Sequence, residues 1–513
     1  MNLSSAGIHT NFTALDWCIV VGYVLAVLAL GVYIRKYIST VADFIVAGRG
    51  IKTFLGAATM TATELCLVTV MYSAQKGFVG GFAAFHIALA AAIVTFIVGI
   101  TGFIVVPLRR MNVMTIPEFY EKRFGRNVRI LGGTILAFSG ILNMGMFIKA
   151  AAVFITCVTG LSSPLEMKII MTALLAVVVI YTTLGGMVSE IVLDYVQFVV
   201  LTIGLLLATL LSIRNLGWNN IIETVSSLKG RAGFDPFDTE GFGIAYVVWM
   251  FLLGLVSCAV WQTVVIRACA AKDTSTVKRL FMWSSIGFLM RFLLPYFLGI
   301  CAFVFIAQHE TLKSIFIPDT GRPDPQVTLM AMPLFLSQIL PAGLIGIVTA
   351  GMLAAFMSTH DSYLLCWSAV LTQDVIAPCF KKPLSSKTRL LLVRIFIVCI
   401  SIFVLIWGLW YPLGEDLWDY MAISGAIYFT GATALLVLGI YWKRASRTGA
   451  YLALITGFSA ILGLKSVQLR VGINIASEIV GLSVITIAFL LMFLGSRAFP
   501  DKNRPVTLGS EQI

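Results

Sequence analysis

The chain has few charged residues for its length, and this scarcity excludes an ordinary soluble globular protein. Only 12% of its 513 residues are Asp, Glu, Lys or Arg, roughly half the fraction found in typical soluble domains. Hydrophobic residues make up 59% of the chain, and the mean hydropathy is +0.96. The composition therefore predicts an all-α polytopic membrane protein.

The chain also lacks the signatures of nucleotide-driven and covalent chemistry. It contains no P-loop, kinase signature or nucleophile elbow, which argues against a nucleotide-driven pump. Its nine cysteines are scattered singly, without the paired spacing of a zinc, haem or redox site. An intramembrane enzyme would need a converging catalytic set, yet two of the four histidines, His9 and His309, fall in expected external segments. We therefore expect no enzyme activity and no cofactor.

Long apolar runs recur along the whole chain. Because a helix needs about 20 apolar residues to cross a bilayer, we expect about thirteen spans. The first is expected to stay in place, since residues 1 to 15 lack a basic n-region and basic residues follow the first run. The expected spans centre on residues 16 to 35, 52 to 76, 80 to 107, 128 to 158, 165 to 184, 190 to 213, 242 to 267, 281 to 307, 341 to 377, 390 to 411, 416 to 441, 449 to 465 and 474 to 496.

The distribution of positive charge predicts the orientation. The net charge is +12, and basic residues cluster after the first, third, seventh, ninth and eleventh expected spans. If spans alternate, all these loops lie on one side, which the positive-inside rule makes cytoplasmic. We expect a multi-pass plasma-membrane protein, in a bacterial inner membrane, with its N-terminus outside and its C-terminus inside. The clusters include Arg35, Lys36, Arg109, Arg110, Arg267, Lys272, Lys381, Lys382, Lys443 and Arg444.

The stretch 353 to 376 places five consecutive polar residues, 358 to 362, inside an otherwise apolar helix. Buried hydroxyl and carboxyl groups are costly unless they are paired or line a site. Ala355, Ser358, Thr359 and Ser362 follow the i, i+3, i+4, i+7 pattern and so share one helix face. A carbonyl and three hydroxyls on one stripe indicate a site for a small hard cation.

Two expected spans contain small and polar residues that interrupt their apolar character. The helix after Lys52 reads FLGAATMTATELCLVTVMYSAQKGF and carries a single acid, Glu64. The helix after Gly243 reads IAYVVWMFLLGLVSCAVWQTVVIR and includes Trp261 and Gln262. Secondary transporters use matching broken helices in two inverted halves. The pattern therefore favours a carrier.

Four separated segments resemble the sodium/solute symporter family. TIPEFYEKRFGR at 115 to 126 is similar to the family segment TxPEFLEKRFG, and TTLGGMVSEIVLDYVQ at 182 to 197 to YTxxGGxxAVxxTDxxQ. LAAFMSTHDSYLLCWSAVLTQDV at 353 to 375 and YWKRASRTGAYLALITG at 441 to 457 match two further segments in family order. The resemblance implies a core of two inverted five-helix repeats, each beginning with a discontinuous helix.

We expect the chain to form one transmembrane domain over residues 1 to 513. The resemblance implies that this domain has five parts. Its expected parts are a peripheral first helix at 16 to 35, a first repeat at 52 to 213, a second repeat at 242 to 441, peripheral helices at 449 to 496 and a cytoplasmic tail at 497 to 513.

By position, the resemblance implies a main sodium site. Ser358 and Thr359 match its two hydroxyl ligands, and Ala355 would supply a carbonyl one turn earlier. Carbonyls of Ala57 and Met60 on the first repeat helix would complete the site, because oxygen ligands suit a hard monovalent cation. A shift of register by one residue would give the pair Ala58 and Thr61 instead.

A second ion site is the next implication of the resemblance. Asp194 matches an aspartate that helps form such a site in some relatives, although Leu193 here replaces the usual threonine. Ser362 is the expected second contributor. An alternative role for Asp194 is pairing with a cytoplasmic arginine. Asp361 also matches a family position, where helix packing or gating is the expected role.

The expected solute site contains Glu64, Trp261 and Gln262. Residues 59 to 63, TMTAT, and the Trp-Gln pair resemble the choline-transporter branch of the family. That branch has a tryptophan where this chain has Glu64, and Ile266 replaces the glutamine before the family arginine. The aromatic cage is therefore incomplete, although Trp261 offers a cation–π face and Glu64 a counter-charge.

Lys149 and His86 are two further residues of the expected solute site. Lys149, deep in the fourth span, could bind a carboxylate, pair with Glu64 or extend outward from the helix end. If Glu64 takes an amine and Lys149 a carboxylate, the solute is zwitterionic, such as an amino acid or related amine. If they pair, a sugar or polyol fits as well. His86 is either a packing residue or a proton-linked group.

The predicted function is sodium-coupled uptake of a small organic solute, an amino acid or other amine-containing or zwitterionic compound, across the plasma membrane by alternating access. One charge crossing 100 mV supplies about 2.3 kcal/mol, and a tenfold sodium gradient about 1.4 kcal/mol. The expected partners are sodium, the solute and membrane lipid, with no nucleic acid, and a monomer is sufficient. The alternatives are a transporter-like solute sensor that works with a separate signalling partner, or a symporter of a sugar, polyol or monocarboxylate.

Overall fold

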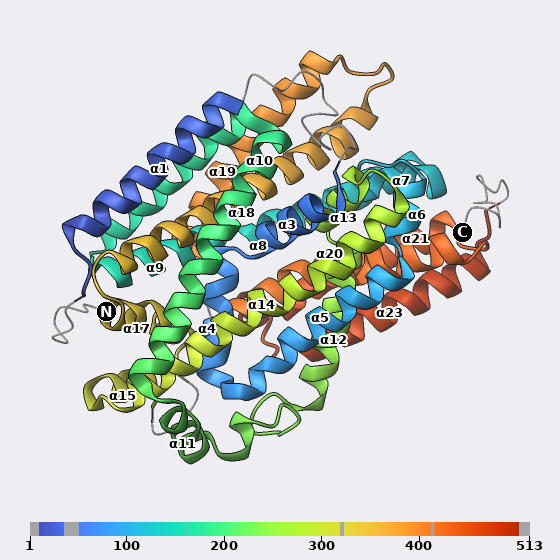
Figure 1. Ribbon diagram of the computed structural model, residues 1–513. Coiled ribbons are helices and arrows are strands. Elements are labelled where there is room, and N and C mark those ends of the chain that lie inside the picture. The colour runs from blue at the N-terminus through green and yellow to red at the C-terminus, as the bar shows by residue number, and fades with distance from the viewer. Residues whose placement is uncertain (1–9, 35–50, 162, 319–322, 412–414, 502–513) are drawn as a thin grey trace.

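The structure is a computed structural model that describes residues 10–34, 51–161, 163–318, 323–411 and 415–501. Over these residues the fold is built from helices, and the one β-bridge joins Ile51 to Ala271. Most long helices run in roughly the same direction and pack side by side (Figure 1). The expected all-α class is confirmed.

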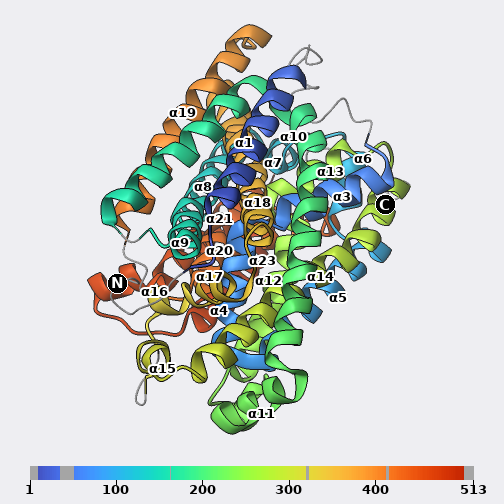
Figure 2. The ribbon, with the colours of Figure 1, turned by 60° about the vertical axis from the view of Figure 1, so that its left-hand side comes forward.

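Nine helical stretches of the described chain are long and apolar enough to cross a bilayer, or ten if the bent pair Arg447–Gly463 and Lys465–Val471 forms one span. The expected number of thirteen remains a prediction. The structure differs from the expected spans in α10, a single helix (Pro164–Leu216) that covers two of them. No proline interrupts residues 165 to 216. Its first half, teal, lies along α1 (Ala14–Ile34), and its second half, green, leads toward α11 (Trp218–Lys229) (Figures 1 and 2).

The first expected repeat opens on a broken helix. Its two parts, α3 (Thr53–Glu64) and α4 (Leu67–Gly80), are separated by Leu65 and Cys66. The Cys66 sulfur caps α4 by accepting a hydrogen bond from the Thr69 amide at 3.3 Å. The helices that follow are η4 (Gly81–Ala84), α5 (Phe85–Thr101), α6 (Val105–Arg110), α7 (Ile116–Phe124), α8 (Arg126–Met144), α9 (Phe147–Thr159) and α10.

The second expected repeat also opens on a broken helix. Trp261, with extended backbone, separates α12 (Gly243–Val260) from α13 (Gln262–Ala270). Both predicted discontinuities are therefore present. Further elements are η5 (Gly230–Gly233), α14 (Thr274–Ala307), α15 (Glu310–Phe316), α16 (Pro325–Thr328), α17 (Ala331–Ile339), α18 (Leu344–Val370), the π-helical η6 (Leu371–Ile376), η7 (Ala377–Cys379), α19 (Ser386–Trp410) and α20 (Leu417–Tyr441).

The most buried helices surround the two breaks. In the most apolar 18-residue stretch of α18 and its continuation to Cys379, 89% is buried inside the protein, whereas only 28% of the corresponding stretch of α19 is buried. The outer face of α19 exposes Leu391, Ile395, Ile402 and Ile406, as expected of a helix that faces hydrocarbon. The chain ends in α21 (Arg447–Phe458), η8 (Ser459–Gly463), α22 (Lys465–Val471) and α23 (Ser477–Ala498). This arrangement keeps both breaks in the interior.

Two glycines allow α4 to cross α14 at very short range. A Cβ atom on Gly77 would lie 2.0 Å from the Tyr296 carbonyl oxygen, and one on Gly299 would lie 1.9 Å from the Ala74 carbonyl oxygen. Both obstacles are backbone atoms, so a side-chain rotation cannot relieve them. The crossing holds the second half of the first broken helix against the bundle.

We expect Gly77→Ala and Gly299→Ala each to lower stability by about 1–3 kcal/mol, the usual cost of overpacking a tight contact. Thermal unfolding of the purified protein in detergent measures the effect. Gly22→Ala in α1 is the control, because a Cβ there meets nothing within 4 Å. Equal unfolding temperatures for all three variants would contradict the close crossing.

Candidate functional site

The first helix break leaves backbone carbonyls that need partners, because the last turn of a helix cannot satisfy them internally. The Thr359 hydroxyl on α18 donates to the Thr63 carbonyl at 3.0 Å. The Thr69 hydroxyl on α4 donates to the Glu64 carbonyl at 2.8 Å. Two hydroxyls from different helices therefore hold the end of α3.

Of the expected sodium ligands on α18, Thr359 contacts this region directly. Ala355, Ser358 and Thr359 are all at least 96% buried. α18 packs against α3, and the Thr359–Thr63 bond shows where the two helices meet. The hydroxyl-bearing face thus lies against the end of the first broken helix.

Ala57 and Met60, the expected carbonyl ligands, are also buried. Both lie within α3, and the break begins after them, at Leu65. The Ala57 carbonyl additionally accepts a hydrogen bond from the Thr61 hydroxyl at 2.8 Å. The helix that carries them, α3, packs against α18.

Of the residues expected at a second ion site, Ser362 contacts an arginine. Its hydroxyl oxygen lies 3.4 Å from the Arg267 Nη2 atom, which also bonds the Thr63 hydroxyl. Arg267 is anchored on its own helix by a 2.8 Å bond to the Thr263 carbonyl. Asp361 is buried beside Ser362 on α18. Asp194 lies in α10, and its side chain falls outside the described part of the structure.

Glu64 forms an ion pair with Arg291 of α14. Its Oε2 atom lies 2.9 Å from Arg291 Nη1, and its Oε1 atom accepts a 3.3 Å bond from the Thr263 hydroxyl. The guanidinium sits over the rings of Phe288 and Phe292, 3.9 and 4.4 Å from their centroids. Cation–π contact and the carboxylate therefore both stabilise this buried cation.

Arg291 was missed by the sequence analysis, although the signal was present. It is a cation within the expected span 281 to 307, and an ionisable residue inside a span is a functional candidate by default.

Lys149 and His86 lie elsewhere. The Lys149 ammonium donates to the Tyr411 carbonyl at 2.9 Å, so Glu64 is paired with Arg291 and not with Lys149 in this structure. His86 Nδ1 lies 2.7 Å from the Ala83 carbonyl oxygen, and its ring packs edge-on against Phe242. Neither residue lines the two cavities described below.

Trp261 and Gln262 occupy the second break but face other groups. The Trp261 indole donates to the Tyr363 hydroxyl at 2.9 Å. The Gln262 carbonyl oxygen accepts a bond from the Ile116 amide at 2.9 Å, which ties α13 to the start of α7. Neither side chain lines the two cavities described below.

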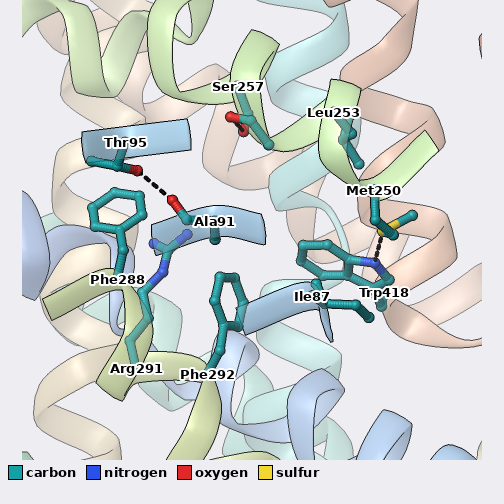
Figure 3. Close-up of a pocket in the computed structure, with 11 residues that line it drawn as sticks. Ile87, Ala91, Thr95, Met250, Leu253, Ser257, Phe288, Arg291, Phe292 and Trp418 are labelled. Carbon is teal, nitrogen blue, oxygen red and sulfur yellow. Dashed lines mark hydrogen bonds between the residues drawn. The ribbon is translucent and has the colours of Figure 1, made fainter. Parts of the chain in front are cut away.

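Two cavities flank the Glu64–Arg291 pair. The first contains the Arg291 guanidinium among aromatic and aliphatic side chains (Figure 3). The second contains Glu64 and adjoins Thr359. We call them the arginine chamber and the glutamate chamber. The arginine chamber is lined by Ile87, Ala91, Thr95, Met250, Leu253, Gly254, Ser257, Phe288, Arg291, Phe292 and Trp418. The glutamate chamber is lined by Thr63, Glu64, Cys66, Val68, Thr69, Tyr72, Asn143, Phe147, Thr359, Tyr363 and Met421.

The chambers are adjacent and differ in chemistry. Tyr72 lines the glutamate chamber, and its ring packs 4.6 Å from Trp418 of the arginine chamber. Hydroxyl and amide groups are frequent in the glutamate chamber, whereas rings and aliphatic groups surround Arg291. A small molecule placed across the ion pair would meet a carboxylate on one side and a guanidinium on the other.

Comparison with known protein families decides the class. The model of the sodium:solute symporter family matches residues 44–457. The chain belongs to the sodium:solute symporter family. It is therefore a multi-pass, Na⁺-coupled transporter of a small solute, not an enzyme, and Na⁺ is its coupling ion.

Curated relatives of this symporter include sugar and inositol carriers. It is 26% identical over 505 residues to sodium/glucose cotransporter 4 of Mus musculus, covering 88% of this chain and 68% of the relative. It is 23% identical to the sodium/glucose cotransporter of Vibrio parahaemolyticus, covering 90% and 87%. It is 25% identical to sodium/myo-inositol cotransporter 2 of Bos taurus, covering 88% and 69%.

Solved structures confirm the fold of the symporter. A Na⁺-coupled sialic acid symporter in a substrate-bound outward-open state superposes with a TM-score of 0.80 at 19% identity, covering 97% of this chain and 100% of the other. MhsT in complex with L-phenylalanine superposes with a TM-score of 0.55 at 15% identity, covering 86% and 99%. The predicted inverted-repeat transporter fold is thus confirmed.

In the symporter, an ionic cluster joins α4 to α20 at one end of the path through the chambers. The buried Lys76 ammonium lies 2.8 Å from Asp416 and 2.9 Å from Asp419. The Tyr246 hydroxyl of α12 donates to Asp419 at 3.1 Å. This Lys76 cluster links both broken helices to α20, on the side expected to be external.

A second polar cluster joins the helices at the other end. Arg129 of α8 lies 2.8 Å from Asp374 of η6, and the Thr115 hydroxyl donates to the same carboxylate at 2.9 Å. Arg109 donates to the Ala271 carbonyl, just beyond α13, at 2.8 Å. The chambers therefore lie between two sets of polar contacts.

We expect loss of one partner of the Glu64–Arg291 pair to be strongly destabilising, because the other charge remains buried. Glu64→Gln or Arg291→Gln should cost about 3–5 kcal/mol, and the double variant less than either single variant. Thermal unfolding in solute-free potassium buffer measures this. Glu310→Gln is the control, since Glu310 pairs with Lys313 at 3.9 Å on the surface and its side chain is 92% exposed. A double variant less stable than both single variants would contradict the pairing.

We expect Lys76→Gln to loosen the contact between α4 and α20, because the variant removes the cation of α4 that attracts Asp416 and Asp419 of α20. Cys66 lines the glutamate chamber and serves as the reporter. Its alkylation, followed by peptide mass spectrometry, should become severalfold faster in the variant. Arg231→Gln removes an exposed pair with Asp235 and should leave the rate unchanged. An unchanged rate in Lys76→Gln would show that the cluster does not close the chamber.

Proposed function

We propose that this symporter carries a small zwitterionic organic solute, an amino acid or a related amine, together with Na⁺. The observation that supports this proposal is the Glu64–Arg291 pair, which lies between two chambers. The solute would insert between the two side chains. Its carboxylate would bind Arg291, and its ammonium group would bind Glu64.

This exchange of partners preserves the charge balance of the site. A buried charge that loses its partner is expensive, whereas exchange of one charged partner for another keeps both groups neutralised. An α-amino acid carries its two charges close together, and the Glu64 and Arg291 atoms lie 2.9 Å apart. A solute with only one charge would leave either Glu64 or Arg291 without a counter-charge.

The chambers favour different ends of such a solute. Phe288, Phe292 and Trp418 surround Arg291 in the arginine chamber, which suits a carboxylate attached to an apolar body. Asn143 and Thr69 accompany Glu64 in the glutamate chamber, where an ammonium group finds acceptors. We therefore assign the apolar part of the solute to the arginine chamber.

For the ion, we propose the site formed by Ala57, Met60, Ala355, Ser358 and Thr359. It adjoins the glutamate chamber through Thr359, so that ion and solute sit on the same broken helix. Asp194 and Ser362 form the proposed second site. Trp261, Gln262, Lys149 and His86 act from outside the chambers, where Trp261 supports Tyr363 and Gln262 anchors α13.

The transport cycle follows from this placement. We propose that residues 52–213 and 242–441 form the two repeats, and that Na⁺ and solute close the broken helices before the bundle reorients. The N-terminus is proposed to lie outside and the C-terminus in the cytoplasm of a bacterial cell. Opening of the Lys76 cluster would admit solute, and opening of the Arg129–Asp374 contact would release it.

A neutral polyol or sugar is the second candidate. The named glucose and inositol carriers among the relatives favour it. In that case the ion pair would stay closed and offer its outer oxygen and nitrogen atoms to hydroxyl groups. The two candidates differ in whether solute separates Glu64 from Arg291.

Uptake into proteoliposomes after a sodium jump tests the solute class. The panel uses solutes of one skeleton, namely L-leucine, isopentylamine, which lacks the carboxylate, and 4-methylpentanoate, which lacks the amine, with L-phenylalanine, choline, D-glucose and myo-inositol. We expect sodium-dependent uptake of a zwitterion and little of the singly charged analogues. Glu64→Gln should lose zwitterion uptake and improve relative uptake of the carboxylate, while Glu310→Gln serves as the matched surface control.

Other outcomes assign other functions. Sodium-dependent uptake of glucose or inositol without uptake of a zwitterion would favour the polyol carrier, and uptake of 4-methylpentanoate alone a monocarboxylate carrier. Binding of a panel solute without flux would contradict transport and favour a solute sensor.

A further inference from the structure

The Thr359 hydroxyl touches both parts of the proposed site. It is an expected sodium ligand, and it donates to the Thr63 carbonyl at 3.0 Å. Thr63 is the residue directly before Glu64, the proposed solute ligand. One hydroxyl group therefore connects the ion-binding face of α18 to the peptide that carries Glu64.

A hydroxyl group can serve both partners at once. It has one hydrogen to donate and two lone pairs to offer, so its oxygen can bind a cation while its hydrogen remains on the Thr63 carbonyl. A bound cation withdraws electron density from the oxygen and makes the hydroxyl a stronger donor, as in charge-assisted bonds. Ion binding would thus tighten the Thr359–Thr63 bond without changing its partners.

The neighbouring carbonyl provides an internal comparison. The Glu64 carbonyl accepts a bond of similar length, 2.8 Å, from the Thr69 hydroxyl. Thr69 belongs to α4, whereas Thr359 belongs to the helix with the proposed ion ligands. Only one of the two bonds holding the end of α3 can therefore respond directly to the ion.

We propose that Thr359 is a positioning residue that transmits sodium binding to the solute site by fixing the Thr63–Glu64 peptide. This inference rests on the proposed sodium site but not on the class of the solute. Without the Thr359 hydroxyl, sodium would still bind through the remaining ligands, yet the ion would no longer order Glu64.

Hydrogen exchange followed by mass spectrometry tests the inference on the full-length protein with NaCl as the only probe and KCl of equal concentration as the reference. We expect sodium to slow exchange of the amides in and on either side of the break, residues 63 to 68. Thr359→Val should abolish this protection at every sodium concentration, and Thr359→Ser should retain it. Ser358→Ala should shift the sodium midpoint upward and still reach full protection. Thr69→Val should raise exchange in both salts and keep the sodium effect.

Transport provides the second readout. In the wild type, sodium should lower the KM of the panel solute that is taken up best. In Thr359→Val the KM should stay about tenfold higher at saturating sodium, the effect of losing one charge-assisted hydrogen bond. Thr359→Ser should restore the sodium dependence of KM, and Thr69→Val should raise KM while preserving that dependence.

The outcomes separate this inference from the proposed function. Full sodium protection in Thr359→Val, or equal loss in Ser358→Ala and Thr359→Val, would overturn the positioning role. If the exchange results follow the expected pattern but the transported solute is a sugar, the zwitterion assignment fails and the role of Thr359 stands.

Discussion

The fold depends on one constraint, which is that broken helices in an apolar environment must still satisfy their backbone groups. At the first break, hydroxyls of Thr359 and Thr69 satisfy the carbonyls of Thr63 and Glu64. These side chains come from α18 and α4, so the break cannot form without both helices. The same hydroxyl-rich region that completes the backbone is suited to bind a hard cation. In this family member, the backbone groups that need hydrogen bonds and the proposed sodium site thus lie in the same region.

Charge balance is the second consequence of an apolar surrounding. Glu64 and Arg291 neutralise each other between the two chambers, and Lys76 is neutralised by Asp416 and Asp419 near the end of the path. A solute that enters the centre must exchange charges with the pair or leave it intact. This choice separates zwitterions from neutral polyols, and it links solute selection to the same broken helix that contacts Thr359.

The sequence predicted the class and the two breaks because these depend on local features. Each of these features lies within one continuous stretch of sequence. They are the apolar runs, the interrupted helices at Glu64 and Trp261, and the helix face formed by Ala355, Ser358 and Thr359. The partners of the charges could not be read in this way. Arg291 lies 227 residues from Glu64, and nothing in either segment states that the two helices meet. Lys149 was an equally reasonable partner until the structure placed it at the Tyr411 carbonyl.

The solute-binding residues expected from the family resemblance were the least predictable part of the site. Trp261 and Gln262 stand at the second break, as expected, but side-chain direction follows from the local helix geometry and the packing of α7 and α18. The sequence shows where the helix breaks, but it does not show in which direction these two side chains point. The boundary between the spans expected at 165 to 184 and 190 to 213 was similarly hard to place, because α10 runs as one helix from Pro164 to Leu216.

The most direct test of the central claim is an experimental structure of the symporter with Na⁺ and its transported solute bound. The account predicts that the Glu64–Arg291 contact is replaced by two new contacts, from Arg291 to a solute carboxylate and from Glu64 to a solute ammonium group, with Na⁺ beside Thr359. An intact Glu64–Arg291 pair with the solute bound elsewhere, or an ion site away from α18, would contradict it.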